Sequence, residues 1–192
     1  MIVKCDVLVV GAGCAGSVAA LKLGKEGFNV VLIERESKVG GHTEPKFDIS
    51  EDSGLGGILG ELNLPYSEKT GRSSWFSRDY SFTLESKVSD LYFKRGPLSD
   101  CFEVQVVKKA VDSGVQLFLG SELSNFKING TSIDSVKLSS KNDDVTLEPK
   151  VVIAADGFNS GMAGKMGLHV LRDTAEIVGY GIMGLNFNMP PA

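Results

Sequence analysis

The residues best suited to chemistry are a glycine-rich stretch near the N-terminus and an acid that follows it. Residues 11–16 read GAGCAG, a GxGxxG pattern, and Glu34 stands 18 residues after Gly16. Glycines at this spacing allow a tight turn and let backbone amides approach a phosphate, while a carboxylate further on can accept both hydroxyls of a ribose. The pattern therefore predicts a dinucleotide site in which Glu34 disfavours a 2′-phosphate.

These groups need a strand, a helix and a second strand to position them. Residues 6–10 and 29–33 are apolar and are predicted as strands, and residues 17–25 have the apolar spacing of a helix that Gly27 ends. The amides and the positive dipole end at the helix N-terminus would face the phosphates. This context favours a phosphate site over a generic strand–helix–strand unit with a glycine turn.

Cys14 lies inside the glycine stretch and has two interpretations. A thiolate of lowered pKa is conceivable at a helix N-terminus. A small residue that fills a tight turn is favoured, because a thiolate would repel the neighbouring phosphates.

A second carboxylate follows a later apolar run. Residues 151–160 read VVIAADGFNS, in which Val151–Ala155 is typical of a strand buried on both faces, and Asp156 and Gly157 come directly after it. Ligands of open α/β sheets bind outside the carboxyl ends of the strands, so these two residues predict a second cofactor contact. A simple turn at a strand end is the alternative.

The middle of the chain is predicted to mix sheet and helix. Val39–Gly41 either lets backbone approach a cofactor or forms a plain turn. Aromatic residues between 73 and 93 either line a pocket for an apolar substrate or pack in a core. The expected elements are a short helix over 54–62, two or three antiparallel strands over 73–93, a helix over 98–113, a strand over 115–119 and a three-stranded antiparallel meander over 121–148.

Composition excludes several classes. The 192 residues carry a net charge of −4, which argues against nucleic acid as a partner. Three scattered cysteines without a CxxC pair favour a reducing compartment, and two histidines with no clustered ligands argue against a metal site. The N-terminal apolar run is too short to cross a bilayer, so a cytoplasmic location is expected.

The order of these elements resembles the FAD-binding fold of the glutathione-reductase type, in the branch of flavin hydroxylases and geranylgeranyl reductases. The matching motifs are Gly11, Gly13, Gly16 and Glu34, then Ala155-Asp156-Gly157 with Ser160 and Lys165-Met166-Gly167-Leu168 after it. Lys165 stands where an arginine is more usual, and 44–48 (EPKFD) replaces a Cys-Gly-rich stretch beside the flavin. The family's later Gly-Asp motif is absent, so the resemblance covers the N-terminal part of a longer fold.

The resemblance implies an α/β fold: a Rossmann-like parallel sheet with helices on one face, an antiparallel β-meander on the other and an inserted β-rich segment. It implies FAD as cofactor, with Arg95 meeting the phosphates or the flavin side, where a solvated surface arginine is the alternative. No catalytic acid or base is assigned. The candidate cofactor-binding residues are Gly11, Gly13, Cys14, Ala15, Gly16, Glu34, Arg35, Gly41, Arg95, Leu123, Ala155, Asp156 and Gly157.

The implied activity is reduction of carbon–carbon double bonds of isoprenoid lipid chains by hydride from reduced flavin, with an external electron donor. The alternatives are a flavin-dependent monooxygenase or halogenase, and a non-catalytic FAD-binding fragment that needs a partner chain. Residues 1–192 are expected to form one FAD-binding domain, in which 37–94 and 174–192 contribute to an incomplete substrate-side β region. Peripheral membrane contact, and a dimer or partner chain covering residues 177–189, are further expectations.

Overall fold

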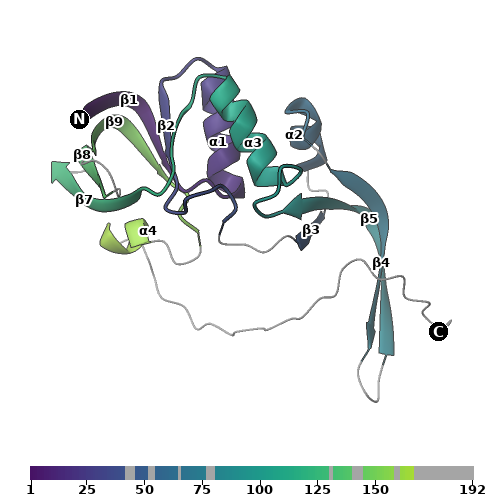
Figure 1. Cartoon of the computed structure of the whole chain (residues 1–192). Helices are drawn as coiled ribbons and strands as arrows, with labels where there is room; N and C mark the ends of the chain where they lie inside the picture. The colour runs from purple at the N-terminus through teal and green to yellow at the C-terminus, as the bar shows by residue number, and fades with distance from the viewer. Residues whose placement is uncertain are drawn as a thin grey trace.

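The computed structural model describes residues 1–41, 46–51, 55–64, 66–76, 81–129, 132–139, 145–157 and 161–166 (Figure 1). The elements in chain order are β1 (Ile2–Val10), α1 (Cys14–Lys25), β2 (Val30–Ile33), β3 (Lys46–Glu51), α2 (Leu55–Glu61), β4 (Ser67–Phe76), β5 (Ser81–Arg95), α3 (Phe102–Asp112), β6 (Gln116–Phe118), β7 (Glu122–Asn129), β8 (Ser132–Ser139), β9 (Val145–Ala154) and α4 (Gly161–Lys165).

The main sheet has six strands in the order β6-β2-β1-β9-β8-β7. The first four run parallel, and β8 and β7 continue the sheet antiparallel. Val10 at the end of β1 pairs with Ile33 of β2 on one side and with Ala154 of β9 on the other. The register therefore brings the carboxyl ends of three parallel strands to one edge.

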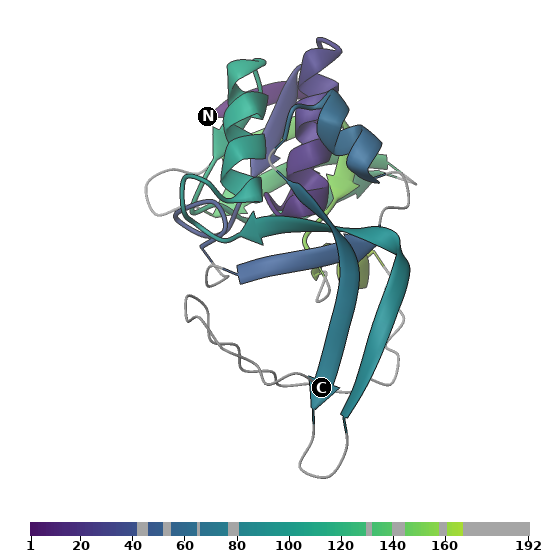
Figure 2. The same cartoon turned by 90° about the vertical axis from the view of Figure 1, so that its right-hand side faces the viewer.

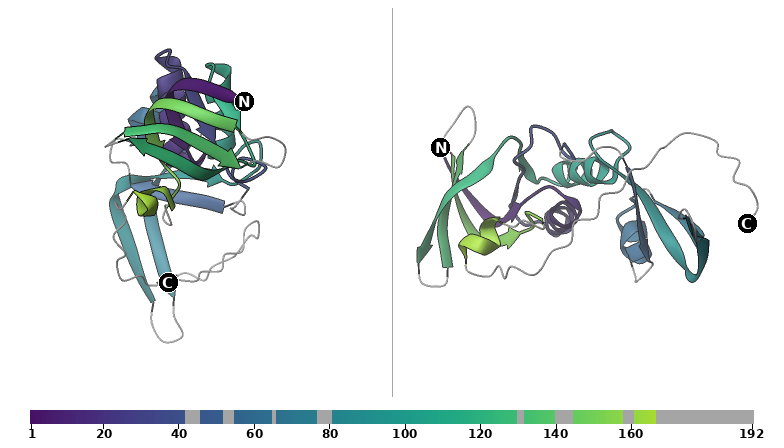
Figure 3. Two further views of the ribbon diagram at one scale, coloured as in Figure 1. Left: turned by 90° about the vertical axis from the view of Figure 1, so that its left-hand side faces the viewer. Right: turned by 90° about the horizontal axis from the view of Figure 1, so that it is seen from below.

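Alternation along the central strands divides the core into two layers. Val7 and Val9 of β1 belong to the cluster that contains the buried faces of α1 and α3, whereas Leu8 and Val10 belong to the cluster with the β8 residues Val136 and Leu138. Side chains of successive strand residues point to opposite faces, so the helices cover one face and the meander covers the other. Figure 3 (left) shows β7, β8 and β9 on the side turned away from the helices. This arrangement confirms the predicted α/β architecture.

A second sheet, in the order β3-β5-β4, is antiparallel and extends away from the main sheet (Figure 2). Leu91 of β5, Leu59 of α2 and Leu62, which follows α2 directly, join the helix-side core. These contacts fix this unit to the rest of the fold. The predicted helix over 54–62 and strands over 73–93 are thus confirmed. The strand β3 was not predicted, because only two alternating apolar residues, Phe47 and Ile49, mark it in an otherwise polar stretch.

The strand predicted at 151–155 and the last meander strand are one continuous strand, β9. The expectation that Val151–Ala155 is buried on both faces is wrong: Val151 is 55% exposed, and Ala154 is exposed. The reason is that β8 pairs with β9 only over Val145–Leu147, so the second half of β9 has β1 as its neighbour within the described residues.

Among all the residues that the structure describes, no helix is long and apolar enough to span a membrane.

Candidate functional site

Three chain segments meet at the carboxyl edge of the main sheet. Gly11 follows β1 and donates its amide to Ile33 O at 2.9 Å, and Ala155 follows β9 and donates its amide to Val10 O at 2.9 Å. Glu34 follows β2 directly. The two motifs that lie 140 residues apart in the sequence are therefore adjacent in the fold, as the sequence predicts.

The three glycines of the GxGxxG pattern have different surroundings. Gly11 has φ +101°, and a Cβ on it would lie 2.5 Å from Ala155 O. A Cβ on Gly16 would lie 1.9 Å from Gly11 O, whereas a Cβ on Gly13 would meet no atom of the described residues within 4 Å. Gly11 and Gly16 thus allow the turn, the strand end and the helix to pack together. Gly13 leaves open space before α1.

That open space lies at an uncapped helix N-terminus. Gly13 is the N-cap of α1, no side chain in the described part of the chain caps the helix, and its first turn contains no acidic residue. Cys14, Ala15 and Gly16 follow, and Ala15 is exposed. The first amides of a helix lack intrahelical acceptors, and the helix dipole adds positive potential. The residues present therefore fit a phosphate-bearing cofactor at this position.

Glu34 is a buried carboxylate, 7% exposed, beside the glycine turn. Its Oε2 accepts a hydrogen bond from Ala12 N at 2.9 Å, and its Oε1 accepts one from Glu36 N at 3.0 Å. A carboxylate has about four lone-pair sites, so both oxygens keep the capacity to accept from hydroxyl groups. The neighbouring Arg35 has a mostly exposed side chain whose Nε lies 3.6 Å from Glu36 Oε1.

Asp156 connects the end of β9 with α4. Its Oδ2 accepts a hydrogen bond from Met162 N at 3.0 Å, and Gly157 has φ +85°. A Cβ on Gly11 would lie 3.2 Å from the Asp156 Cα, which places the carboxylate segment against the glycine turn. Ser160 and residues 167–168 of the same motif lie outside the described residues.

Arg95 is neither fully solvated nor remote from the site. Its side chain is 21% exposed, and its Nε lies 2.6 Å from Oε1 of Glu103, a carboxylate with no exposed surface. Cys14 Sγ donates to the same Oε1 at 3.7 Å. The sequence interpretation missed Glu103, although its position four residues before Val107 and seven before Ala110 puts it on the apolar face of α3.

The other candidate residues have protein neighbours. A Cβ on Gly40 would lie 2.4 Å from Gly96 O, and one on Gly41 would lie 2.9 Å from Lys38 O, so this turn packs against the protein itself. Leu123 pairs with Leu138 in the meander and packs against its core. Ser121, two residues earlier, donates its amide to Glu34 O at 2.9 Å, which brings the start of β7 to the same edge.

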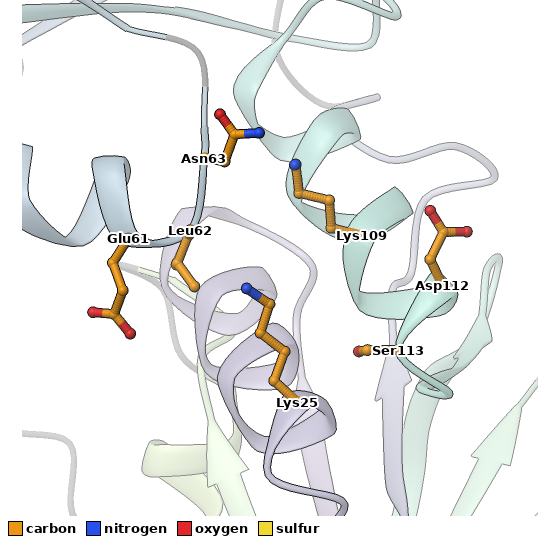
Figure 4. A pocket seen from close by; sticks show the side chains of 7 residues that line it. All are labelled: Lys25, Glu61, Leu62, Asn63, Lys109, Asp112 and Ser113. Atoms are coloured by element: carbon orange, nitrogen blue, oxygen red, sulfur yellow. The ribbon is translucent and has the colours of Figure 1, made fainter.

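A cleft of about 300 Å³ lies at the C-terminal ends of α1 and α3, away from the glycine turn (Figure 4). It is lined by Lys25, Glu61, Leu62, Asn63, Lys109, Asp112 and Ser113. Lys25 ends the helix that Cys14 begins, and a helix of 12 residues is about 18 Å long. None of the predicted cofactor residues lines this cleft.

Among the described residues, no three His, Cys, Asp or Glu side chains form a group that could hold a metal ion.

Comparison with known proteins gives a family match over most of the chain. A family model described as FAD dependent oxidoreductase matches residues 6–158. Protein FixC of Escherichia coli O157:H7 is 29% identical over 177 residues, which cover 85% of this chain and 39% of FixC. A protein in the nifH2 5′ region of Methanosarcina barkeri is 27% identical over 176 residues, covering 89% of this chain and 92% of that protein. The probable electron transfer flavoprotein-quinone oxidoreductase YdiS of E. coli K12 is 29% identical, covering 92% of this chain and 43% of YdiS.

Solved structures share the fold. A geranylgeranyl bacteriochlorophyll reductase-like protein of Thermoplasma acidophilum has a TM-score of 0.70 at 23% identity, covering 90% of this chain and 44% of its own. PqsL of Pseudomonas aeruginosa, a probable FAD-dependent monooxygenase, has a TM-score of 0.67 at 20% identity. The match covers 90% of this chain and 48% of PqsL. The chain thus spans about two fifths of FixC and less than half of these structures.

Proposed function

The chain belongs to the FAD-dependent oxidoreductase family, and on that premise we propose that its cofactor binds along the carboxyl edge of β1, β2 and β9. The family match confirms the prediction of FAD. The observation that carries the placement is Gly13, which leaves open space at an uncapped helix N-terminus between two tightly packed glycines.

Each motif has a distinct role in this proposal. The first-turn amides of α1 bind the pyrophosphate, which their missing acceptors and the helix dipole favour. Glu34 accepts the hydroxyls of the adenosine ribose, while its bonds to Ala12 and Glu36 hold the carboxylate in place. Asp156 and Gly157 form a second polar contact beside Gly11. Arg35, Gly41 and Leu123 remain candidates at the margins of the same edge.

The finer proposal concerns the reaction. When bound, FAD supplies hydride transfer, and we propose that the acceptor is a carbon–carbon double bond of an isoprenoid chain. Support comes from the motifs shared with geranylgeranyl reductases and from the fold shared with the reductase-like protein of T. acidophilum. In this proposal residues 1–192 are one FAD-binding domain, and 37–94 with 174–192 contribute to the substrate-side β region. Residues 167–192 lie outside the described part of the chain.

Two other reactions have a specific observation in their favour. The similarity to YdiS favours electron exchange with a redox protein or a quinone, which would make the external electron donor or acceptor a partner of the flavin. The fold shared with PqsL favours oxygen chemistry of the monooxygenase kind, to which a halogenase is the related alternative. A non-catalytic fragment that works with a partner chain over residues 177–189 is the third alternative.

The first test is FAD binding by the purified chain. Flavin absorbance in the preparation and the Kd for added FAD are measured, with FMN as the control that lacks the adenosine half. Binding of FAD well above that of FMN is expected, because the pyrophosphate and ribose contacts belong to that half. A colourless protein that takes up no FAD would contradict the proposed placement of the cofactor.

The reaction is tested with the flavin-loaded chain. Chemically reduced protein is mixed anaerobically with a geranylgeranyl-bearing lipid, and product saturation is followed by mass spectrometry. Substrate-coupled oxygen consumption would instead favour a monooxygenase, and reduction of a quinone analogue would favour the electron-transfer alternative.

A further inference from the structure

Glu103 is the common partner of three groups that come from different parts of the chain. It accepts from Arg95 Nε at 2.6 Å, from Gly96 N at 3.4 Å and from Cys14 Sγ at 3.7 Å. Its side chain is fully buried in the first turn of α3. The carboxylate therefore joins α3, the turn after β5 and the first residue of α1.

The position of this carboxylate has an electrostatic consequence. A buried carboxylate without a paired cation is costly, and opposite charges a few ångströms apart interact strongly in a site screened from water. Glu103 lies within contact of Cys14, which begins the helix whose amides are proposed to bind pyrophosphate. Unpaired, it would repel that phosphate. Paired with Arg95, it adds no net charge.

We propose that Arg95 and Glu103 act as one neutral unit at the N-terminus of α1, in which Arg95 is a positioning residue that acts on the phosphate site through Glu103. The proposal rests on the placement of FAD given above and deepens it. Arg95 neutralises Glu103, and Glu103 fixes both the Gly96 turn and the Cys14 thiol, which remains a neutral hydrogen-bond donor. Gly40 packs against the carbonyl oxygen of Gly96 in the same turn.

Cys14 provides a probe of this unit that does not depend on FAD. Cys5 and Cys101 are buried, while Cys14 is partly exposed, so Cys14 is the most accessible of the three thiols. The thiolate is the form that alkylating reagents attack, and nearby negative charge disfavours it. The alkylation rate of Cys14 therefore reports the net charge around Glu103.

The first experiment measures alkylation of Cys14 by iodoacetamide in the apoprotein, with peptide mass spectrometry to assign the site. We expect Glu103→Gln to raise the rate at least about threefold and Arg95→Gln to lower it by a similar factor, because the two changes shift the local charge in opposite directions. Glu61→Gln, which removes an exposed carboxylate of α2, is the matched control and should leave the rate unchanged. Equal alkylation rates of Cys14 in wild type and Glu103→Gln would overturn the proposed influence of Glu103 on the Cys14 thiol.

The second experiment measures the Kd for FAD across the double-mutant cycle. Arg95→Gln should weaken binding by about tenfold or more, since it leaves an unpaired carboxylate beside the phosphates. Adding Glu103→Gln to that variant should restore binding to within about threefold of wild type, and Glu103→Gln alone should bind at least as tightly as wild type.

The results separate the possible causes. A double variant that binds as weakly as Arg95→Gln would show that Arg95 contacts FAD independently of Glu103, and would overturn the proposal. If Arg95→Gln does not fold, Glu103→Gln and the double variant still test it. Failure of the wild-type chain to bind FAD would contradict the proposed function. The ranking of the Cys14 alkylation rates in Glu103→Gln, wild type and Arg95→Gln would still test the pairing of Arg95 with Glu103.

Discussion

Replacing Gly13 and Gly16 by alanine should separate cofactor binding from folding, although both glycines belong to one motif. A Cβ on Gly13 meets nothing within 4 Å, and its φ of −71° suits any residue. A Cβ on Gly16 would lie 1.9 Å from Gly11 O, which is backbone and cannot rotate away. We therefore expect Gly13→Ala to weaken FAD binding and Gly16→Ala to weaken the fold.

The expected sizes follow from these surroundings. Gly13→Ala loses a few tenths to about 1 kcal/mol at the N-cap and gains a similar amount from a stiffer unfolded chain, so stability should change by less than about 0.5 kcal/mol. A methyl group in the phosphate position should remove one charge-assisted hydrogen bond, about 1.5–3 kcal/mol, which weakens FAD binding by about 10- to 150-fold. Gly16→Ala should cost about 1–3 kcal/mol of folding free energy or more.

Urea denaturation of the apoprotein and FAD titration give the two quantities. Gly60→Ala is the matched control, because its Cβ also meets nothing within 4 Å and it lies in α2, away from the cofactor edge. FAD binding by Gly13→Ala at the wild-type Kd would refute the placement of phosphate at α1. Wild-type stability of Gly16→Ala would refute the packing argument.

Three further substitutions test individual contacts. Glu34→Ala should lower the free energy of unfolding by about 2–4 kcal/mol in urea, since two backbone amides lose their acceptor. Asp156→Ala should cost about 0.5–2 kcal/mol by removing the acceptor for Met162 N, and Asp156→Asn should recover most of it. Lys150→Gln should reduce the loss of thermal stability that accompanies acidification below about pH 4. The hydrogen bond from Lys150 is the main cause that lowers the pKa of Asp6 below its ordinary 3.8, so this carboxylate stabilises the fold above that pH and loses the effect as pH falls through its folded pKa.

The strand–helix–strand unit and the meander were predictable because local pattern decides them. The apolar runs at 6–10 and 29–33 alternate with a helical stretch of small residues, and the turns between meander strands carry polar residues. The boundaries were less accurate: α1 begins at Cys14 rather than Ser17, because the glycine turn passes directly into the helix. The strand β3 carries only two alternating apolar residues, Phe47 and Ile49, and is defined by its pairing with β5.

The sequence predicted where the motifs lie in the fold but not the contacts that their residues make. The sequence places Gly11, Glu34 and Asp156 at strand ends, and the register of β1 with β2 and β9 then brings them together. Glu103 could not be assigned from spacing alone, since an acid on the apolar face of a helix needs a partner that only the fold supplies. Arg95, which the sequence assigned to the cofactor, is that partner.

The GxGxxG pattern treats three glycines alike, whereas the structure gives them different physical reasons. Gly11 and Gly16 are required by backbone oxygens of the protein, Ala155 O and Gly11 O, which lie where their Cβ atoms would be. Because Ala155 O lies 2.5 Å from where a Cβ of Gly11 would be, the end of β9 can pack against this turn only if residue 11 is glycine. Gly13 has no such neighbour among the described residues, so the fold alone would accept alanine there. The proposed placement of the phosphate supplies the missing reason, because a methyl group at residue 13 would occupy the space that the phosphate needs.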